Sequence, residues 1–258
     1  MLTQGQQPEM TRDPAVARRH ASSSADWILV AVLSMTAGAV DVIGFLTLGG
    51  LFVAHITGNL VVLAAHYVTG GFGQIGPLLS VPVFIIVLGV ITGLFADKVN
   101  GGTLRTLLVF EAVVLLAFLG LGVGLGPFSN PDSGMAVFVG MLGVVAMATQ
   151  NAVIRLELPR LPTTAVITTN TVQLAIDLAV LIRGQGEPED LKRARGRAPL
   201  TFLSVAGFAV GCAVGGILEL HLGLWALVLP VALSWIALGA AQYVQQPMPA
   251  AKVAHSSS

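Results

Sequence analysis

Two short polar phrases in an otherwise apolar chain have the residue types needed to bind a small polar solute. Residues 54–64 read AHITGNLVVLA, and residues 165–175 read AVITTNTVQLA. Each phrase contains a Thr and an Asn two positions apart, namely Thr57 and Asn59, and Thr168 and Asn170. Amide and hydroxyl groups offer donors and acceptors that can replace the water around a solute or ion. The same groups also serve as hydrogen-bonded packing contacts between membrane helices, worth about 0.6 kcal/mol each, so both interpretations are open.

Polar side chains recur at helical spacing around these phrases. If residues 54–68 are helical, one face carries His55, Asn59, Val62 and His66. The equivalent positions of the second phrase carry Val166, Asn170, Gln173 and Asp177. Each phrase is therefore predicted to present a polar stripe. His55, Gln173 and Asp177 join the Thr and Asn residues as candidates for a solute or ion path.

Three carboxylates lie within apolar runs, where charge is costly and often serves ions or protons: Asp41, Glu111 and Asp177. Asp41, in the middle of AGAVDVIGF, is the best candidate for binding and releasing a proton, with a hydrogen-bonded packing role as an equal alternative. Glu111 lies about one turn inside its run, so we expect it to reach the membrane interface. Asn151, in the segment QNAVIR, is a further path candidate and shares a helix face with Arg155.

The composition indicates that these residues lie in a membrane. Of the 258 residues, 55% are hydrophobic and 10% are charged, whereas soluble domains carry about a quarter charged residues. The mean hydropathy is +0.84. Apolar runs, most of them near the ~20 residues that a membrane-spanning helix needs, occur at 27–48, 51–68, 78–96, 106–125, 134–154, 164–182, 199–218 and 222–243. The sequence predicts an all-α polytopic membrane protein whose main partner is the lipid bilayer.

The sequence also argues against several functions. The formal net charge is zero, which gives no indication of a nucleic-acid partner. There is one cysteine, Cys212, and no His, Cys and carboxylate cluster with metal-ligand spacing, so we predict no disulfide and no metal site. No G-x-x-x-x-G-K-[ST] motif and no nucleophile–base pair are visible. We therefore predict no cofactor and no enzymatic activity.

The two phrases belong to a longer repetition. Shifting the chain by 111 residues places 37–64 over 148–175 with ten of 28 positions identical, whereas unrelated membrane segments would agree at roughly one position in ten. We predict one membrane domain at 26–244 with two related halves, a common plan among transporters. The halves cover about 27–126 and 134–243. The polar ends, 1–25 and 245–258, are expected to be cytoplasmic tails, the first of them disordered.

The distribution of Lys and Arg predicts the topology. If all eight apolar runs cross the membrane from a cytoplasmic N-terminus, nine of the 13 Lys and Arg residues lie inside and four outside. If 51–68 and 164–182 instead enter and return on the same side, six spans remain and all 13 lie inside, as the positive-inside rule prefers. Each half then has three full spans, so the second half is inverted relative to the first. We predict six spans plus two re-entrant or broken helical segments, with eight full spans as the alternative.

The segments AGAVDVIGFLTLGGLFVAHITGN, QNAVIR and PTTAVITTN together resemble the YoaK-like family of bacterial integral membrane proteins, over nearly all of 27–243. The resemblance implies about six membrane spans and a bacterial cytoplasmic membrane, and it brings no established substrate. The second triplet, Thr168-Thr169-Asn170, lacks the glycine of Thr57-Gly58-Asn59. A gentler backbone bend is expected there.

Two functions are consistent with these features. The first is a small secondary transporter or channel for a small polar solute or ion, with Asp41 as a proton-coupling group. The second is a membrane scaffold or sensor in which the polar stripes only hold helices together. The sequence does not name the substrate, and it leaves a homo-oligomer open.

Overall fold

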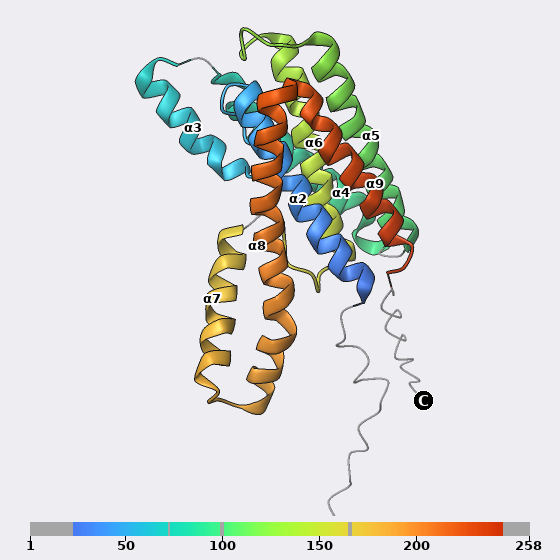
Figure 1. Ribbon diagram of the computed structural model, residues 1–258. Coiled ribbons are helices and arrows are strands. Elements are labelled where there is room, and N and C mark those ends of the chain that lie inside the picture. The colour runs from blue at the N-terminus through green and yellow to red at the C-terminus, as the bar shows by residue number, and fades with distance from the viewer. Residues whose placement is uncertain (1–22, 72, 99–100, 165–166, 245–258) are drawn as a thin grey trace, which may run out of the picture.

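The computed structural model describes residues 23–71, 73–98, 101–164 and 167–244, and every regular element in these ranges is a helix (Figure 1). The first four α-helices are α2 (Ser24–Thr47), α3 (Ile56–Thr69), α4 (Ile75–Phe95) and α5 (Gly101–Leu125). The second four are α6 (Gly134–Glu157), α7 (Ile167–Arg183), α8 (Pro188–Leu222) and α9 (Val228–Ala241). Two 3-10 helices, η1 (Ala96–Lys98) and η2 (Gly223–Leu227), follow α4 and α8. The tail 245–258 and nearly all of the tail 1–25 lie outside the described residues.

Five helical segments in the described ranges are long and apolar enough to cross a membrane. Four correspond to α2, α4 with η1, α5 and α6, and the fifth, Pro188–Tyr243, contains α8, η2 and α9. The chain reverses direction at η2, so this last segment passes along the bundle twice (Figure 1). Helices α3 and α7 have only 14 and 17 residues, short of the ~20 that a full span needs. The predicted all-α polytopic membrane protein is confirmed.

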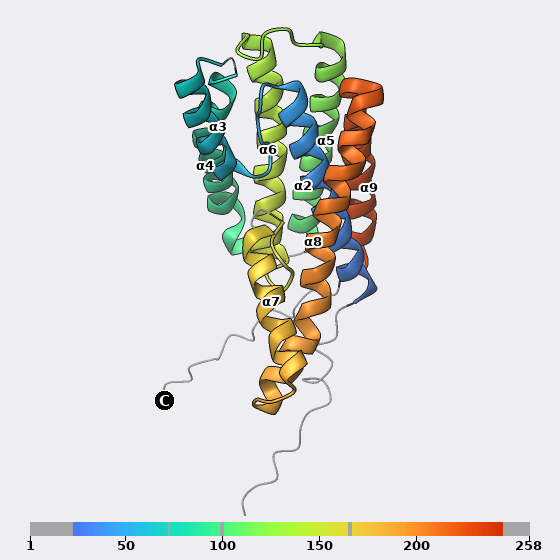
Figure 2. The ribbon, with the colours of Figure 1, turned by 60° about the vertical axis from the view of Figure 1, so that its left-hand side comes forward.

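The chain turns back into the bundle after α2. Gly49 and Gly50 adopt φ values of +66° and +85°, which glycine reaches without steric cost, and residues 51–55 then run down beside α2. Helix α3 starts at this depth and returns to the end of the bundle where α2 finished, whereas α7 runs to the opposite end (Figures 1 and 2). The two short helices therefore have the re-entrant arrangement that the charge distribution predicts.

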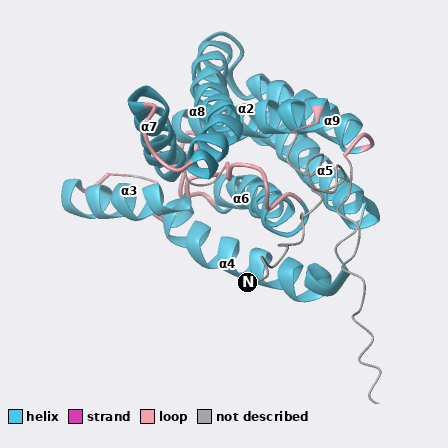
Figure 3. Cartoon of the chain, turned by 90° about the horizontal axis from the view of Figure 1, so that it is seen from below, coloured by secondary structure: helices cyan, strands magenta, loops and turns pink. Residues whose placement is uncertain are grey.

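Helices of the two halves interleave in the packed core. Helix α2 packs against α8 and α9, and α6 packs against α4 and α5. Seen from below, α3 and α4 form one flank and α7 and α8 another, with α6 between them (Figure 3). The contact between α2 and α8 is close because glycines face backbone atoms: a Cβ added at Gly38 would overlap the carbonyl oxygen of Phe208, and one at Gly211 that of Met35.

Two helices begin before the apolar runs that mark them in the sequence. Helix α8 begins at Pro188, 11 residues before its apolar run, with Glu189 and Asp190 in its first turn. Helix α5 begins at Gly101, five residues before the apolar run. Glu111 is therefore about three turns inside the helix, and it is fully buried instead of reaching the interface.

Helices α3 and α7 bury very little of their surface. Asn59 is the buried residue of α3, and Asn170 and Asp177 are those of α7. The apolar side chains of both helices, such as Leu60, Val61, Val172 and Ile176, are exposed. The fully buried residues of each short helix are thus polar, whereas many of its apolar residues are exposed.

Candidate functional site

The re-entrant segment of the first half is held by a buried carboxylate. Asp41 lies on the inner side of α2 and is 2% exposed. Its Oδ1 accepts hydrogen bonds from the backbone N–H groups of Val53, Ala54 and His55, at 2.8, 2.6 and 3.3 Å. Its Oδ2 lies 2.5 Å from Nδ1 of His55. These contacts fix the tip of the segment to α2.

His55 connects this carboxylate to the second half of the chain. Its ring contacts Phe208 of α8 edge-on, with ring centroids 4.7 Å apart. If Nδ1–H donates to Asp41, Nε2 of a neutral imidazole is left as an acceptor. Among the described residues, this buried Nε2 has no hydrogen-bond partner. Nε2 is therefore a buried acceptor without a donor in this part of the structure.

Asn59 clamps the same segment from the other side. Its Nδ2 donates to the carbonyl oxygen of Phe52 and to Oγ of Ser80, both at 2.7 Å, and its Oδ1 accepts from the N–H of Phe52 at 2.8 Å. Asn59 is 0% exposed. The side chain joins the re-entrant backbone to α4, and both of its amide hydrogens are used in doing so.

Asn170 makes the corresponding contacts in the second half. Its Nδ2 donates to the carbonyl oxygen of Thr163 at 2.7 Å and to Oγ of Ser204 at 3.1 Å. Thr163 stands 111 residues after Phe52, as Asn170 does after Asn59. Ser204 of α8 also pairs with Ser34 of α2, Oγ to Oγ, at 3.0 Å. Each Asn thus bonds to the carbonyl oxygen of the residue seven positions before it and to a Ser of a neighbouring helix.

The other predicted residues differ in burial and in hydrogen bonding. Thr57 and Thr168 are exposed, so they do not accompany the buried Asn residues into the bundle. Asp177 is buried, but Arg197 binds it through two nitrogens at 2.6 and 2.9 Å, and Gln173 donates to it at 3.0 Å. Asn151 is buried and donates to the carbonyl oxygen of Met147 in its own helix, whereas Arg155 is exposed. The bonds described for Asn59 lie within residues 52–80 and those for Asn170 within 163–204, and a solute or ion path along both residues stays a prediction.

Two further buried polar residues were not among the predicted path residues. Gln150 donates to the carbonyl oxygen of Leu33 at 3.1 Å and to Oγ1 of Thr164 at 2.9 Å, so α6 holds the second re-entrant segment as Asp41 holds the first. Glu111 is 0% exposed, and neither of its oxygens has a hydrogen-bond partner among the described residues. The signal for Glu111 was present, since it is a carboxylate in an apolar run, but its depth depended on where α5 begins.

Comparisons with known proteins agree with a membrane protein. The chain matches the family described as "Protein of unknown function (DUF1275)" over residues 29–240. It is 37% identical over 98 residues to the UPF0700 transmembrane protein YoaK of Bacillus subtilis (strain 168), a match that covers 35% of this chain and 40% of YoaK. No solved structure matches. The helical bundle, the apolar spans and the family match over most of the chain lead to one conclusion: this multi-pass transmembrane protein belongs to the DUF1275 family.

Proposed function

We propose that the protein is a small secondary transporter or channel for a small polar solute or ion, built from two inverted halves. The observation that carries this proposal is the pair of re-entrant segments, which start inside the bundle, run to opposite ends and are each clamped by an equivalent Asn. Non-helical backbone at membrane depth occurs where it is buried in protein or lines a wet cavity. Inverted repeats with broken helices are a frequent plan of transporters.

The packing of the helices supports the inverted repeat. If α2, α3, α4 and α5 correspond to α6, α7, α8 and α9, each contact has a counterpart: α2 with α8 and α6 with α4, α2 with α9 and α6 with α5, and α3 with α4 and α7 with α8. Corresponding helices run in opposite directions along the bundle (Figure 1). Such symmetry allows two alternative arrangements of similar energy, which alternating access requires.

The Asp41–His55 pair is the coupling group in this proposal. Position 152, equivalent to Asp41, is Ala, and position 166, equivalent to His55, is Val, so the second half has no titratable pair at these positions. The tip of the first segment can therefore respond to a proton or cation, whereas the second is held by neutral groups of Gln150 and Thr164. We place the protein in a bacterial cytoplasmic membrane with both termini in the cytoplasm, since the Lys and Arg residues favour that orientation.

A membrane scaffold without transport is the second candidate. It is favoured by the saturation of Asn59, whose two amide hydrogens and oxygen are all used within the protein. Polar residues that are fully paired in this way act as packing contacts between helices. The two candidates differ in whether any solute crosses the bilayer.

Flux measurements in proteoliposomes test the proposal. Purified protein is reconstituted with a pH-sensitive dye inside, and a panel of inorganic ions, amino acids and sugars is added outside at several pH values. We expect one solute class to move together with protons. His55→Asn keeps a donor near the place of Nδ1 and removes Nε2, so it should abolish the proton-linked part of the flux.

The matched control is His66→Asn, which changes the other histidine of the same region, at the far end of α3. It should leave the flux unchanged. If no solute crosses with the wild-type protein at any pH, the scaffold is the better description. Equal loss of flux in both variants would mean that His55 has no specific coupling role.

A further inference from the structure

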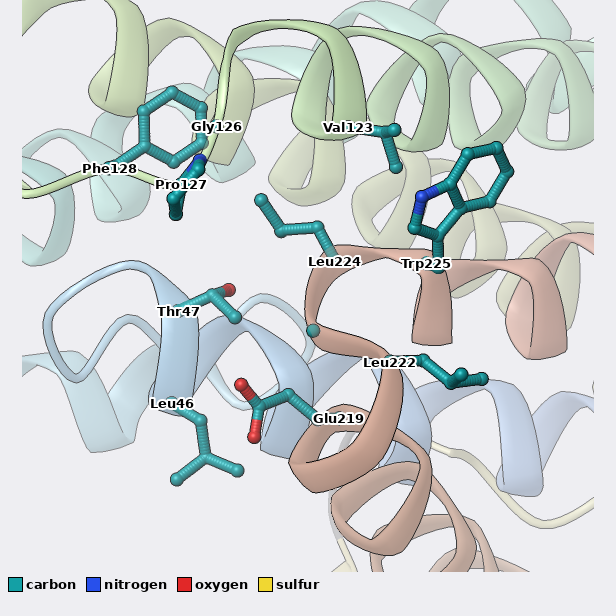
Figure 4. A pocket seen from close by; sticks show the side chains of 11 residues that line it. Leu46, Thr47, Val123, Gly126, Pro127, Phe128, Glu219, Leu222, Leu224 and Trp225 are labelled. Atoms are coloured by element: carbon teal, nitrogen blue, oxygen red, sulfur yellow. The ribbon is translucent and has the colours of Figure 1, made fainter.

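A cavity of about 500 Å³ lies away from the residues discussed so far, at the end of the bundle where α2, α5 and α8 finish (Figure 4). Its volume lies within the range of cavities that hold small organic ligands. Leu46 and Thr47 of α2 form one side, and Phe128, Leu224 and Trp225 lie on the other. None of the predicted path residues lines it.

The backbone gives this cavity a negative electrostatic character. The C-terminus of an α-helix leaves carbonyl groups without intrahelical partners and carries a partial negative charge. Three such ends meet here, because α2 ends at Thr47, α5 at Leu125 and α8 at Leu222. The N–H groups that follow, those of Leu48, Gly126 and Gly223, bond back to one carbonyl each.

A full negative charge adds to these partial ones. The carboxylate of Glu219 points into the cavity between the walls formed by α2 and η2 (Figure 4). No hydrogen bond or ion pair to this carboxylate is found within the described part of the chain. The N–H groups at the start of η2 contribute partial positive charge. The full charge of Glu219 is larger, so the electrostatic potential in the cavity is negative.

Cations of the protein itself are far from this carboxylate. No Lys or Arg lines the cavity. Every Lys and Arg in the described ranges lies toward the opposite end of the bundle, at η1, near the start of α5 and α8, or near the end of α6 and α7. Within the described ranges, Glu219 is thus a carboxylate in a largely apolar recess with no Lys or Arg beside it.

The walls specify what kind of cation fits. Leu46, Val123, Leu222 and Leu224 supply apolar surface, and Trp225 and Phe128 supply aromatic rings. Aromatic faces attract alkylammonium groups by the cation–π interaction. We propose that this cavity binds a monovalent organic cation, an amine or quaternary ammonium with an apolar arm, whose charged group lies at Glu219. This site is independent of the proposed transport function.

Binding of benzyltrimethylammonium to the full chain in detergent tests the proposal. The chain has three Trp residues, and a Trp27→Phe/Trp235→Phe background leaves Trp225 as the only reporter of this cavity. We expect saturable quenching of Trp225 by benzyltrimethylammonium. Benzylsulfonate, an anion of nearly the same shape, should cause no saturable change. Equal binding of both ions, or no saturable binding of the cation, would overturn the proposal.

Removal of the charge on Glu219 locates the binding group. Glu219→Gln should weaken benzyltrimethylammonium binding about tenfold, because a partly solvated ion pair of this kind is lost. Glu189→Gln, at the exposed start of the same helix, should leave the affinity unchanged. Val123→Phe fills part of the cavity and should also weaken binding, which gives a second readout if Glu219→Gln fails to fold. Unchanged affinity in Glu219→Gln, measured by calorimetry, would show that the carboxylate is not the binding group.

Discussion

Asp41 and Glu111 are both buried carboxylates, but their surroundings give them opposite electrostatic roles. Asp41 accepts hydrogen bonds from three backbone N–H groups and contacts His55, so its negative charge is compensated. Glu111 has no such donors in the described part of the chain. An ionised carboxylate without partners is strongly disfavoured in a protein interior, whereas a neutral carboxyl group is only moderately so. Asp41 is therefore an anchor, and Glu111 is a polar group that the fold tolerates.

This difference predicts opposite effects of the same substitution. Glu111→Leu should raise the free energy of unfolding by about 1–3 kcal/mol, because it removes an unpaired buried polar group at similar volume. Asp41→Leu should lower it by about 3–5 kcal/mol, because it removes the acceptor for a buried network. Chemical unfolding of the purified protein in detergent measures both. Destabilisation by Glu111→Leu would mean that its carboxyl group has a partner in the folded protein.

Among the elements, α2 and α8 depend on glycine for their close approach. Gly211→Ala should destabilise the bundle by about 1–3 kcal/mol, because the added methyl group meets the backbone of Met35 and the helices must move apart. Gly216→Ala on the same helix is the matched control, since its Cβ would lie 3.5 Å from the nearest atom, a Cγ2 of Val42. Thermal unfolding of the two variants compares them. Equal stability would show that the contact can widen at little cost.

A connection outside the spans is held by Asp132, between α5 and α6. Its carboxylate accepts from the N–H groups of Gly73 at 2.8 Å and Ile75 at 2.9 Å, which ties this connection to the start of α4. Partial burial of Asp132 acts to raise its pKa, but these backbone hydrogen bonds outweigh that effect and hold the pKa below the ordinary value of 3.8. The folded protein therefore binds the Asp132 proton more weakly than the unfolded chain does.

The sign of the pH dependence follows from this lowered pKa. The stabilisation is complete above the unfolded-state pKa and is lost as the pH falls through the lower folded-state value. The melting temperature of the wild-type protein should therefore fall as the pH drops below about 4. Asp132→Asn should be less stable at neutral pH and should show a smaller fall, which a series of thermal melts measures. An identical fall in wild type and variant would assign it to other carboxylates.

At the scale of the whole molecule, the Lys and Arg residues of the described ranges lie toward one end of the bundle. Single cysteines introduced into a Cys212→Ser background should be protected from an impermeant thiol reagent in intact cells at positions 101, 160 and 190, and labelled at the exposed positions 69 and 130. The reason is that the first three lie near Lys and Arg residues, which favour the cytoplasmic side, and the last two lie at the opposite end. Labelling at 101 and 160 from outside would reverse the assigned orientation of these connections.

The number of spans and the re-entrant segments could be predicted because hydropathy and the Lys and Arg distribution act on the chain at a coarse scale. The 111-residue offset predicts that Asn59 and Asn170 are equivalent because it is ungapped around them. Their partners could not, because Ser80 follows Asn59 by 21 residues and Ser204 follows Asn170 by 34. Helix α8 begins farther before Ser204 than α4 does before Ser80, so the 111-residue offset does not hold for these two residues. The cavity at Glu219 was also not predictable, since three helix ends distant in the sequence form it.

The interleaving of the two halves has a consequence for how the protein is made. Ser34 of α2 finds its hydrogen-bond partner, Ser204 of α8, only 170 residues later in the chain. When α2 leaves the ribosome and enters the bilayer, the helix that covers its glycine face does not yet exist. Chains that stop before α8 would keep this face uncovered and leave α2 without its main contact. Quality-control proteases of the membrane should therefore remove truncated chains, and assembly of the core must wait for nearly complete synthesis.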